Sequence, residues 1–243
     1  AGVEEFIFVT GRGKAAIEDH FDVSYELEKT LVERGRDDVL AAVRAIGLQP
    51  GQISYTRQMD PLGLGHAVWC ARHHVGNEPV AVLLADDLVM SEKSCLAQLV
   101  DIHAETGGNV VGVMEVPAER TDRYGILDIE SDDGRLASAK GLVEKPSPGA
   151  APSQLAIIGR YVLMPEVFEH LSRFEKGAGG EIQLTDAMAR MIGNAPFHGL
   201  RFEGQRFDCG DKIGFFEANI AFALARDEIQ DDVASVLRRY AKD

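Results

Sequence analysis

Two acidic residues follow strand-like stretches that are far apart in the chain. Asp86 comes directly after the apolar run Val80–Ala85, and Asp208 follows the stretch Phe197–Phe207. Ligands of open α/β sheets bind beyond the carboxyl ends of strands, where carboxylates can hold Mg²⁺ together with substrate phosphates. The alternatives are a solvated turn for Asp86 and its neighbour Asp87, and an N-cap of the next helix for Asp208. The pair predicts a Mg²⁺ site.

A glycine-rich loop, Gln58–His66 (QMDPLGLGH), connects a predicted strand to a predicted helix. Gly63 and Gly65 would let the backbone approach a flat ligand closely. The primary amide of Gln58 can pair with the edge of uracil or thymine. An ordinary strand-to-helix turn is the alternative interpretation.

A third candidate is the strand end Glu144-Lys145-Pro146. Glu144 can accept hydrogen bonds from sugar hydroxyls, and Lys145 is a compact cation suited to a phosphate. Pro146 fixes the backbone after them. The alternative is an exposed, charged strand end.

Other catalytic motifs are missing from the sequence. Thr10–Lys14 (TGRGK) follows a strand but has neither P-loop nor GxGxxG spacing. No GxSxG or HExxH motif occurs, and the seven histidines show no metal-ligand spacing.

The elements that must position these residues alternate between apolar strands and amphipathic helices, which indicates an α/β fold with a mixed, mostly parallel, Rossmann-like sheet. The predicted strands are Glu5–Thr10, Gln52–Gln58, Val80–Ala85, Asn109–Val116, Tyr124–Glu130, Leu136–Lys145, Ala156–Met164 and Phe197–Glu203. The predicted helices are Ser24–Ile46 with a break near Gly35, Gly65–His73, Ser91–Glu105 capped by Ser91, Pro165–Phe174, Glu181–Ile192, Lys212–Arg226 and Asp231–Lys242. Val80–Ala85 is expected to be a buried strand, and Asp132-Asp133-Gly134 a hairpin turn.

Length, charge and cysteine content exclude several classes of protein. The 243 residues suit a single domain, residues 1–243, and the formal net charge of −14 argues against a nucleic-acid partner. No apolar run is long enough for a membrane helix, and no signal-peptide pattern is seen. Three cysteines without CxxC spacing fit a reducing, cytoplasmic compartment.

Taken together, these motifs resemble the bacterial UTP–glucose-1-phosphate uridylyltransferases. The resemblance runs to about residue 230 and rests on VTGRGKAAIEDHFD (Val9–Asp22), RQMDPLGLGHAVWCA (Arg57–Ala71), VAVLLADDLV (Val80–Val89), RYGILD (Arg123–Asp128), GLVEKP (Gly141–Pro146), PSQLAIIGRYVL (Pro152–Leu163), GAGGEIQLTDA (Gly177–Ala187) and FDCGDKIGF (Phe207–Phe215).

The resemblance implies a reaction of UTP with α-D-glucose 1-phosphate that gives UDP-glucose and pyrophosphate. It implies that Asp86 and Asp208 hold Mg²⁺, and that Lys145 meets the sugar phosphate. The remaining roles that it implies concern substrate: Gln58, Gly63 and Gly65 would hold uracil, Gly125 and Glu144 would meet glucose hydroxyls, and Ala156 and Ile157 would line the sugar pocket. A homodimer or homotetramer is also implied, with residues of about 210–243 in its contacts.

One departure from the family is large. The family's GxGTR-type loop, which grips the triphosphate, is not found in this sequence, so we expect little or no activity of this polypeptide alone.

Two alternative functions therefore stay open. One is a sugar-nucleotide-dependent glycosyltransferase, which would transfer sugar from UDP-sugar to an acceptor. The other is a non-catalytic sugar-nucleotide-binding protein, which would bind UDP-glucose without pyrophosphate exchange.

Overall fold

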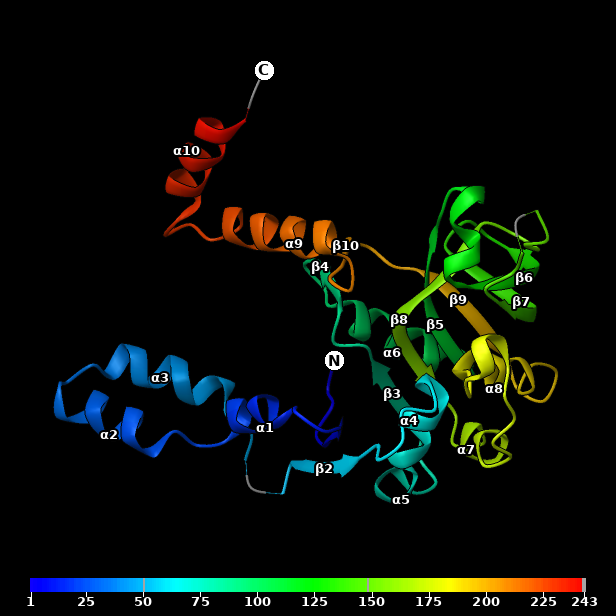
Figure 1. The fold of residues 1–243 in the computed structure, drawn as a ribbon, viewed down its shortest axis with the longest axis horizontal. Helices are drawn as coiled ribbons and strands as arrows, with labels where there is room; N and C mark the ends of the chain where they lie inside the picture. Colours follow the sequence, from blue (N-terminus) through cyan, green and yellow to red (C-terminus); the bar gives the residue numbers. More distant parts are fainter. Residues whose placement is uncertain (50, 148, 242–243) are drawn as a thin grey trace.

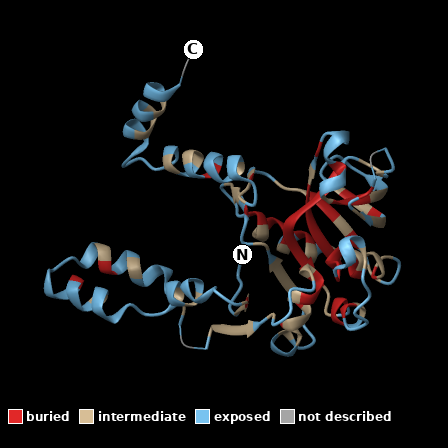
Figure 2. Cartoon of the chain, viewed as in Figure 1, coloured by how far each residue is buried: buried red, intermediate tan, exposed pale blue. Residues whose placement is uncertain are grey.

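The computed structural model describes residues 1–49, 51–147 and 149–241. It has a body built around a six-stranded sheet and two arms that extend from it (Figure 1). Buried residues are concentrated in the body, and the arms are largely exposed (Figure 2).

The sheet of the body is mixed, as predicted, in the order β3-β8-β5-β9-β7-β6. Its strands are β3 (Val80–Leu83), β5 (Asn109–Glu115), β6 (Gly125–Asp132), β7 (Leu136–Glu144), β8 (Leu155–Leu163) and β9 (Phe197–Arg201). The expectation of a mostly parallel sheet is wrong for these strands, because β5–β9 is the parallel pair and the other pairings are antiparallel. The reason is that β8 runs antiparallel to β3, β5 and β6, and β7 runs antiparallel to β6 and β9.

Hydrophobic cores lie on both faces of this sheet. All nine residues of β8 are buried, which explains its almost continuous apolar sequence. Because side chains alternate along a strand, Ile158 faces α6 (Cys95–Thr106) and Ile157 faces the opposite core. That second core is covered by the short helices α4 (Leu64–Cys70), α7 (Val167–Leu171) and α8 (Leu184–Ala189).

Two local predictions need correction. Val80–Ala85 is not a buried strand: β3 pairs only with β8 among the described residues, and Leu83 is 50% exposed. The helix predicted from Ser91 starts later, because residues 87–90 form strand β4, and Ser94 caps α6 by accepting a hydrogen bond from Ala97 N.

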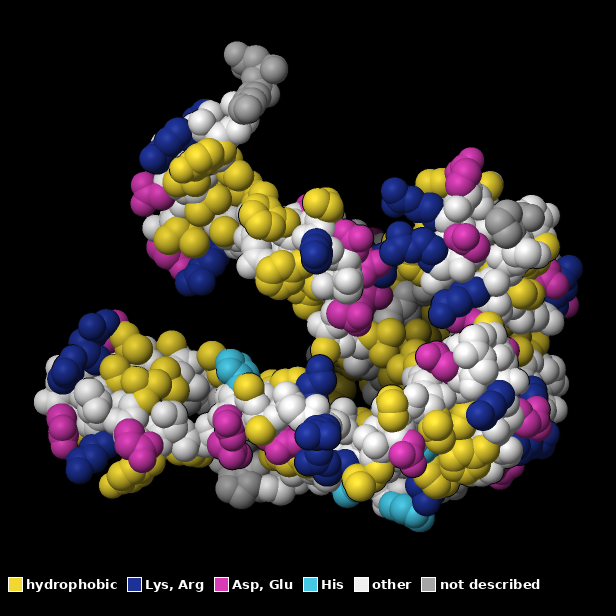
Figure 3. Space-filling view, viewed as in Figure 1, with side chains coloured by type: hydrophobic (Ala, Val, Ile, Leu, Met, Phe, Trp, Pro, Cys, Tyr) yellow, Lys and Arg dark blue, Asp and Glu magenta, His cyan; other side chains and the backbone are white. Residues whose placement is uncertain are grey.

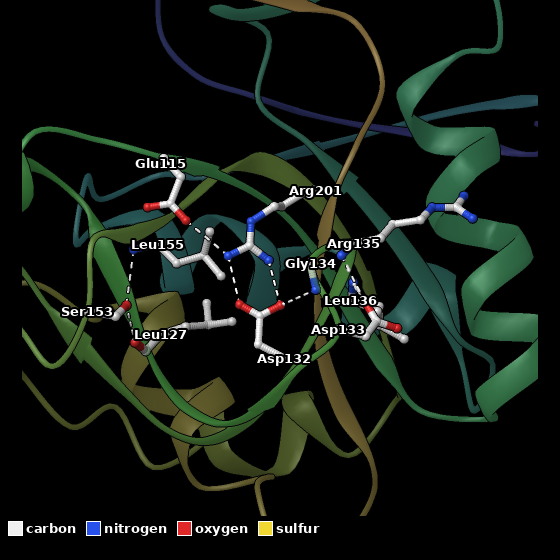
Figure 4. A network of polar contacts seen from close by, with 10 residues as sticks. All are labelled: Glu115, Leu127, Asp132, Asp133, Gly134, Arg135, Leu136, Ser153, Leu155 and Arg201. Carbon is white, nitrogen blue, oxygen red and sulfur yellow. Dashed lines mark hydrogen bonds and ion pairs between the residues drawn. The ribbon is translucent and has the colours of Figure 1, made fainter.

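The turn at Asp132-Asp133-Gly134 joins β6 to β7, as predicted. Asp132 accepts two hydrogen bonds from the guanidinium of Arg201, each 2.8 Å long, and Arg201 also contacts Glu115 (Figure 4). These contacts tie the hairpin to β5 and β9. Hydrogen bonds from Arg201 and from the backbone N–H of Gly134 lower the pKa of Asp132.

The N-terminal arm begins with the parallel pair β1 (Phe6–Thr10) and β2 (Ile53–Arg57). Between them come α1 (Ala15–Phe21), α2 (Tyr25–Glu33) and α3 (Asp37–Ile46). The predicted break at Gly35 is confirmed, since its φ of 62° is left-handed and separates α2 from α3.

The C-terminal arm begins with the antiparallel pair β4 (Asp87–Met90) and β10 (Gln205–Asp208). It continues into α9 (Lys212–Leu224) and α10 (Gln230–Tyr240), which pack on each other. Lys242, the last residue of the predicted final helix, lies outside the described residues. The short elements α5 (Arg72–Val75), η1 (Ala118–Arg123) and η2 (Ala178–Gly180) complete the chain. In the part of the chain that the structure describes, every helix is too short or too polar to span a membrane.

Candidate functional site

The structure brings the carboxylates of Asp86 and Asp208 together. β10 pairs with β4 so that Asp208 lies opposite Asp87, and the N–H of Cys209 donates to Asp86 O at 2.7 Å. A methyl group placed on Gly210 would meet Asp86 Oδ2 at 3.1 Å and Asp208 Oδ1 at 3.2 Å. The two oxygens therefore flank one small space that only a glycine leaves open.

The electrostatics agree with this geometry. Burial raises the pKa of the Cys209 thiol, and the negative charges of Asp208 and Asp86 raise it further. Both carboxylates therefore lie close enough to Cys209 for their charges to act on it. Two such charges at one place need a cation to offset their repulsion.

The helix-cap alternative for Asp208 is wrong. The N-cap of α9 is Asp211, whose Oδ1 accepts hydrogen bonds from Ile213 N at 2.8 Å and Gly214 N at 3.4 Å. Asp208 instead accepts from Gly210 N and lies 3.4 Å from the guanidinium of Arg206. Its carboxylate is thus left to the space that it shares with Asp86.

The donor set fits magnesium better than a structural metal. Within the described residues, no three His, Cys, Asp or Glu side chains are grouped to hold a metal ion. Zinc in structural sites takes four protein ligands, whereas Mg²⁺ keeps waters and substrate phosphates alongside one or two carboxylates. Asp86 and Asp208 supply a set of the second kind.

Asp87 is not the solvated turn residue that its sequence position suggested, because β4 turns its side chain inward. The carboxylate is 6% exposed and pairs with Arg206, with Nε 2.5 Å from Oδ1 and Nη2 3.2 Å from Oδ2. Gly159 N also donates to it at 2.6 Å, and Arg160 bonds the Asp87 carbonyl. Burial lowers the pKa of Arg206, but the hydrogen bonds and charge of Asp87 outweigh burial and raise it overall.

The residues predicted to meet glucose and its phosphate, Gly125, Glu144 and Lys145, lie close together. β6 and β7 place Gly125 opposite Glu144, and a methyl group on Gly125 would meet Thr185 Oγ1 at 2.9 Å and Glu144 Oε2 at 3.2 Å. The Glu144 side chain is 11% exposed and lies 3.7 Å from Lys145 Nζ. Glycine at 125 therefore leaves room between two groups able to bond hydroxyls.

Lys145 adopts a backbone conformation that is unusual for a residue with a side chain. Its φ is 45°, and its N–H donates to Tyr124 O at 3.0 Å. Such a conformation costs about 1–3 kcal/mol and persists where surrounding structure imposes it. Its side chain is half exposed, which suits a cation that meets an incoming phosphate.

Arg206 and Tyr124 join the two ends of the site. The guanidinium that contacts Asp208 lies 5.6 Å from the centre of the Tyr124 ring. Tyr124 in turn precedes Gly125 and accepts the hydrogen bond from Lys145. The carboxylate pair and the residues predicted to meet glucose are thus linked through Arg206 and Tyr124.

Gly63 and Gly65 have a structural role that the sequence did not indicate. A methyl group on Gly63 would meet Glu181 Cβ and Ile182 O at 2.8 Å, and one on Gly65 would meet Ile182 O at 2.8 Å. Packing against residues 181–183 thus explains both glycines without any ligand. A contact of their backbone with a base stays a prediction. The same segment continues to Thr185, beside Gly125, so it connects this loop to the sugar end.

Ala156 and Ile157 lie in the core. Ala156 is fully buried beside Ile126, and Ile157 is 6% exposed within the larger core. They are neighbours on β8, so their side chains point to opposite faces of the sheet and pack into different cores. The structure places neither side chain on an accessible surface, and the prediction that they line a sugar pocket rests on the resemblance alone.

The sequence interpretation missed Thr185, His66, Arg206 and the buried role of Asp87. Thr185 and His66 lie inside motifs that the sequence analysis recognised. Both side chains are about nine-tenths buried, and this burial can be seen only in the structure. Gln58 is half-buried, and its amide nitrogen bonds Gly63 O and His66 Nδ1. Its oxygen is the atom left for a ligand.

Comparisons with known proteins place the chain in a family. The family model described as nucleotidyl transferase matches residues 1–223. The UTP–glucose-1-phosphate uridylyltransferase of Komagataeibacter xylinus is 55% identical over 213 residues, which cover 88% of this chain and 75% of that protein.

Solved structures show the same similarity. A UTP-bound UGPase from Acinetobacter baumannii superimposes with a TM-score of 0.89 at 36% identity, covering 99% of this chain and 84% of that one. A UDP-glucose pyrophosphorylase complexed with UDP-glucose gives a TM-score of 0.80 at 36% identity, covering 91% of this chain and 82% of that one. The chain therefore belongs to the nucleotidyl transferase family and, within it, to the UTP–glucose-1-phosphate uridylyltransferases.

Proposed function

We propose that this chain transfers the uridylyl group of UTP to α-D-glucose 1-phosphate, giving UDP-glucose and pyrophosphate. The observation that carries the proposal is the meeting of the Asp86 and Asp208 carboxylates at one small space beside Gly210. That space is connected to the sugar-facing residues through Arg206 and Tyr124. The names of the similar proteins support the substrates.

The chemistry needs no nucleophile from the protein. A phosphate oxygen of glucose 1-phosphate attacks the α-phosphorus of UTP, and pyrophosphate leaves. Two like charges about 4 Å apart repel by about 4 kcal/mol at an effective dielectric constant of about 20, so positioning and charge neutralisation dominate. When bound, Mg²⁺ would supply the charge that offsets the phosphates, held by Asp86 and Asp208.

The other side chains bind and orient the substrates. Lys145, half exposed at the end of β7, would meet the sugar phosphate. Glu144 and the open position at Gly125 would receive glucose hydroxyls, and a place for Ala156 and Ile157 beside the sugar is proposed on the resemblance alone. Gln58 would meet the uracil edge, with Gly63 and Gly65 shaping the loop.

Pyrophosphate release from UTP and glucose 1-phosphate tests the assignment, together with Mn²⁺-dependent binding of UDP-glucose measured by calorimetry. Because we expect little or no activity of this polypeptide alone, metal-dependent binding is the decisive measurement. Any turnover that is measured should fall by about 100-fold or more in Asp86→Asn and in Asp208→Asn, the scale typical for loss of one electrostatic group. Metal-dependent binding should weaken in parallel, while thermal stability changes little.

Asp211→Asn is the matched control, because this residue lies in the same loop and asparagine caps a helix as well as aspartate does. Metal-dependent binding by Asp208→Asn that equals binding by Asp211→Asn would reject the metal role. Transfer of sugar from UDP-glucose to an acceptor, without pyrophosphate exchange, would favour a glycosyltransferase instead.

The assembly that the proposal includes is a homodimer or homotetramer formed through the C-terminal arm. α9 is apolar on several sides and buries only Ala218. α9 and α10 enclose an open apolar groove of about 660 Å³, lined by Phe215, Phe216, Ile220, Ile229, Val233 and Val236 among others. Hydrophobic side chains gather along this arm and over α2–α3 (Figure 3). Light scattering of Phe216→Glu against the unchanged protein tests the assembly, and a smaller particle is expected for the variant.

We also propose a cytoplasmic location, because the three cysteines are free.

A further inference from the structure

The amide of Gln58 has a defined orientation. Its nitrogen lies 3.0 Å from the carbonyl oxygen of Gly63 and 3.1 Å from Nδ1 of His66. A backbone carbonyl can only accept hydrogen bonds, so the amide atom that faces it must be the nitrogen. The amide oxygen is therefore the atom that these two contacts leave unused.

His66 completes this arrangement. Because one amide proton is directed at Gly63 O, the other is available to Nδ1 of His66, which must then be the acceptor nitrogen of a neutral ring. The ring proton is on Nε2, which faces Cys70 Sγ at 3.9 Å. The Cys70 sulfur can accept a hydrogen bond from Nε2–H, so this contact is compatible with the tautomer that Gln58 requires.

The ring itself is held in place by packing. His66 is 8% exposed, and its ring stacks on Trp69 with centroids 5.8 Å apart and planes 19° from parallel. Phe174 packs on it at 5.9 Å. A fixed ring fixes the position of the acceptor nitrogen, and with it the rotation of the Gln58 amide.

The consequence concerns the nucleobase. Both amide protons of Gln58 are used within the protein, and no described residue donates to its oxygen. That oxygen can only accept a hydrogen bond. Uracil carries N3–H, a donor, whereas cytosine carries an unprotonated N3, an acceptor. An amide oxygen that faces N3 therefore attracts uracil and repels cytosine, whose own donor is the amino group at C4.

We propose that His66 is a positioning residue that holds the Gln58 amide oxygen toward the base and so favours uracil over cytosine nucleotides. The inference rests on the proposed function, in which Gln58 meets the base. His66 need not touch the nucleotide, since it acts through the amide. One hydrogen bond of this kind contributes about 1 kcal/mol, which corresponds to about fivefold in an affinity ratio.

The test compares the affinities of UDP-glucose and CDP-glucose by calorimetry in the presence of Mg²⁺. His66→Phe keeps an aromatic ring against Trp69 and Phe174 but removes the acceptor, and His66→Asn keeps an acceptor but loses the ring. We expect the ratio of the two affinities to fall about fivefold in His66→Phe and to be largely retained in His66→Asn. Gln58→Leu should lose the preference in either background.

If His66 only packed, the ratio of the UDP-glucose and CDP-glucose affinities would be kept in His66→Phe and lost in His66→Asn. That result would overturn the inference and leave the proposed function intact. Failure of the unchanged protein to bind UDP-glucose would reject the proposed function itself, and this inference with it.

A second measurement needs no variant. ¹⁵N NMR of labelled histidine should show the neutral Nε2–H tautomer for His66, and an Nδ1–H tautomer would contradict the assignment.

Discussion

Replacing Arg206 with methionine should destabilise this fold far more than replacing an exposed arginine. The Arg206 and Asp87 side chains are 11% and 6% exposed, and two of their atom pairs lie 2.5 and 3.2 Å apart. Methionine would fill similar space but leave the Asp87 carboxylate buried, with the N–H of Gly159 as its remaining donor among the described residues. Removal of one partner of a buried ion pair typically costs about 3–5 kcal/mol.

The assay is urea unfolding followed by circular dichroism, with free energies of unfolding compared at constant slope. Arg226→Met is the control, because Arg226 pairs with Glu228 where both side chains are about 60% exposed, and such pairs contribute about 0–1 kcal/mol. Combining Arg206→Met with Asp87→Asn should recover part of the loss, since the buried charge is gone. A cost below about 1 kcal/mol for Arg206→Met, similar to that of Arg226→Met, would refute the argument.

Three further predictions concern the rest of the body. Asp132→Asn should reduce stability at pH 7 by about 1 kcal/mol. Because Arg201 lowers the folded-state pKa of Asp132, this difference should be full above pH 4 and vanish as pH falls below it; a constant difference in acid unfolding would contradict it. Gly65→Ala should cost about 1–3 kcal/mol, since its methyl would lie 2.8 Å from Ile182 O, and thermal melts showing no loss would disprove the clash. Burial raises the pKa of Cys95 to about 11 from 9.0, so the unfolded chain ionises first and stability should fall between these pH values. Cys95→Ala should lack that part of the fall, and identical pH profiles would count against it.

Local patterns were sufficient to locate much of the fold. The nine buried residues of β8 and the turn at Asp132–Gly134 are recognisable because each depends on neighbours in the chain. The direction of β8 is not recognisable, since strand direction is set by partners that are distant in sequence. The exposure of β3 follows for the same reason, because an apolar run looks alike at the edge and in the centre of a sheet.

The site shows the same division. Asp86 and Asp208 could be proposed from the sequence because each lies near a strand end: Asp86 is in the exposed turn between β3 and β4, and Asp208 is the last residue of β10. Asp87 was misjudged because its burial depends on Arg206, 119 positions away. Gly65 was singled out for backbone contact with a base, which stays a prediction; the surface that excludes its side chain belongs to Leu171 and residues 182–183, which no local pattern indicates.

The most direct measurement is a crystal structure of this chain with UDP-glucose and Mn²⁺, collected at the manganese absorption edge. The account predicts one strong anomalous peak bound by carboxylate oxygens of both Asp86 and Asp208 and by the nucleotide diphosphate, with the glucose ring beside Glu144. A peak that contacts neither carboxylate, or a diphosphate bound away from this strand exit, would contradict it.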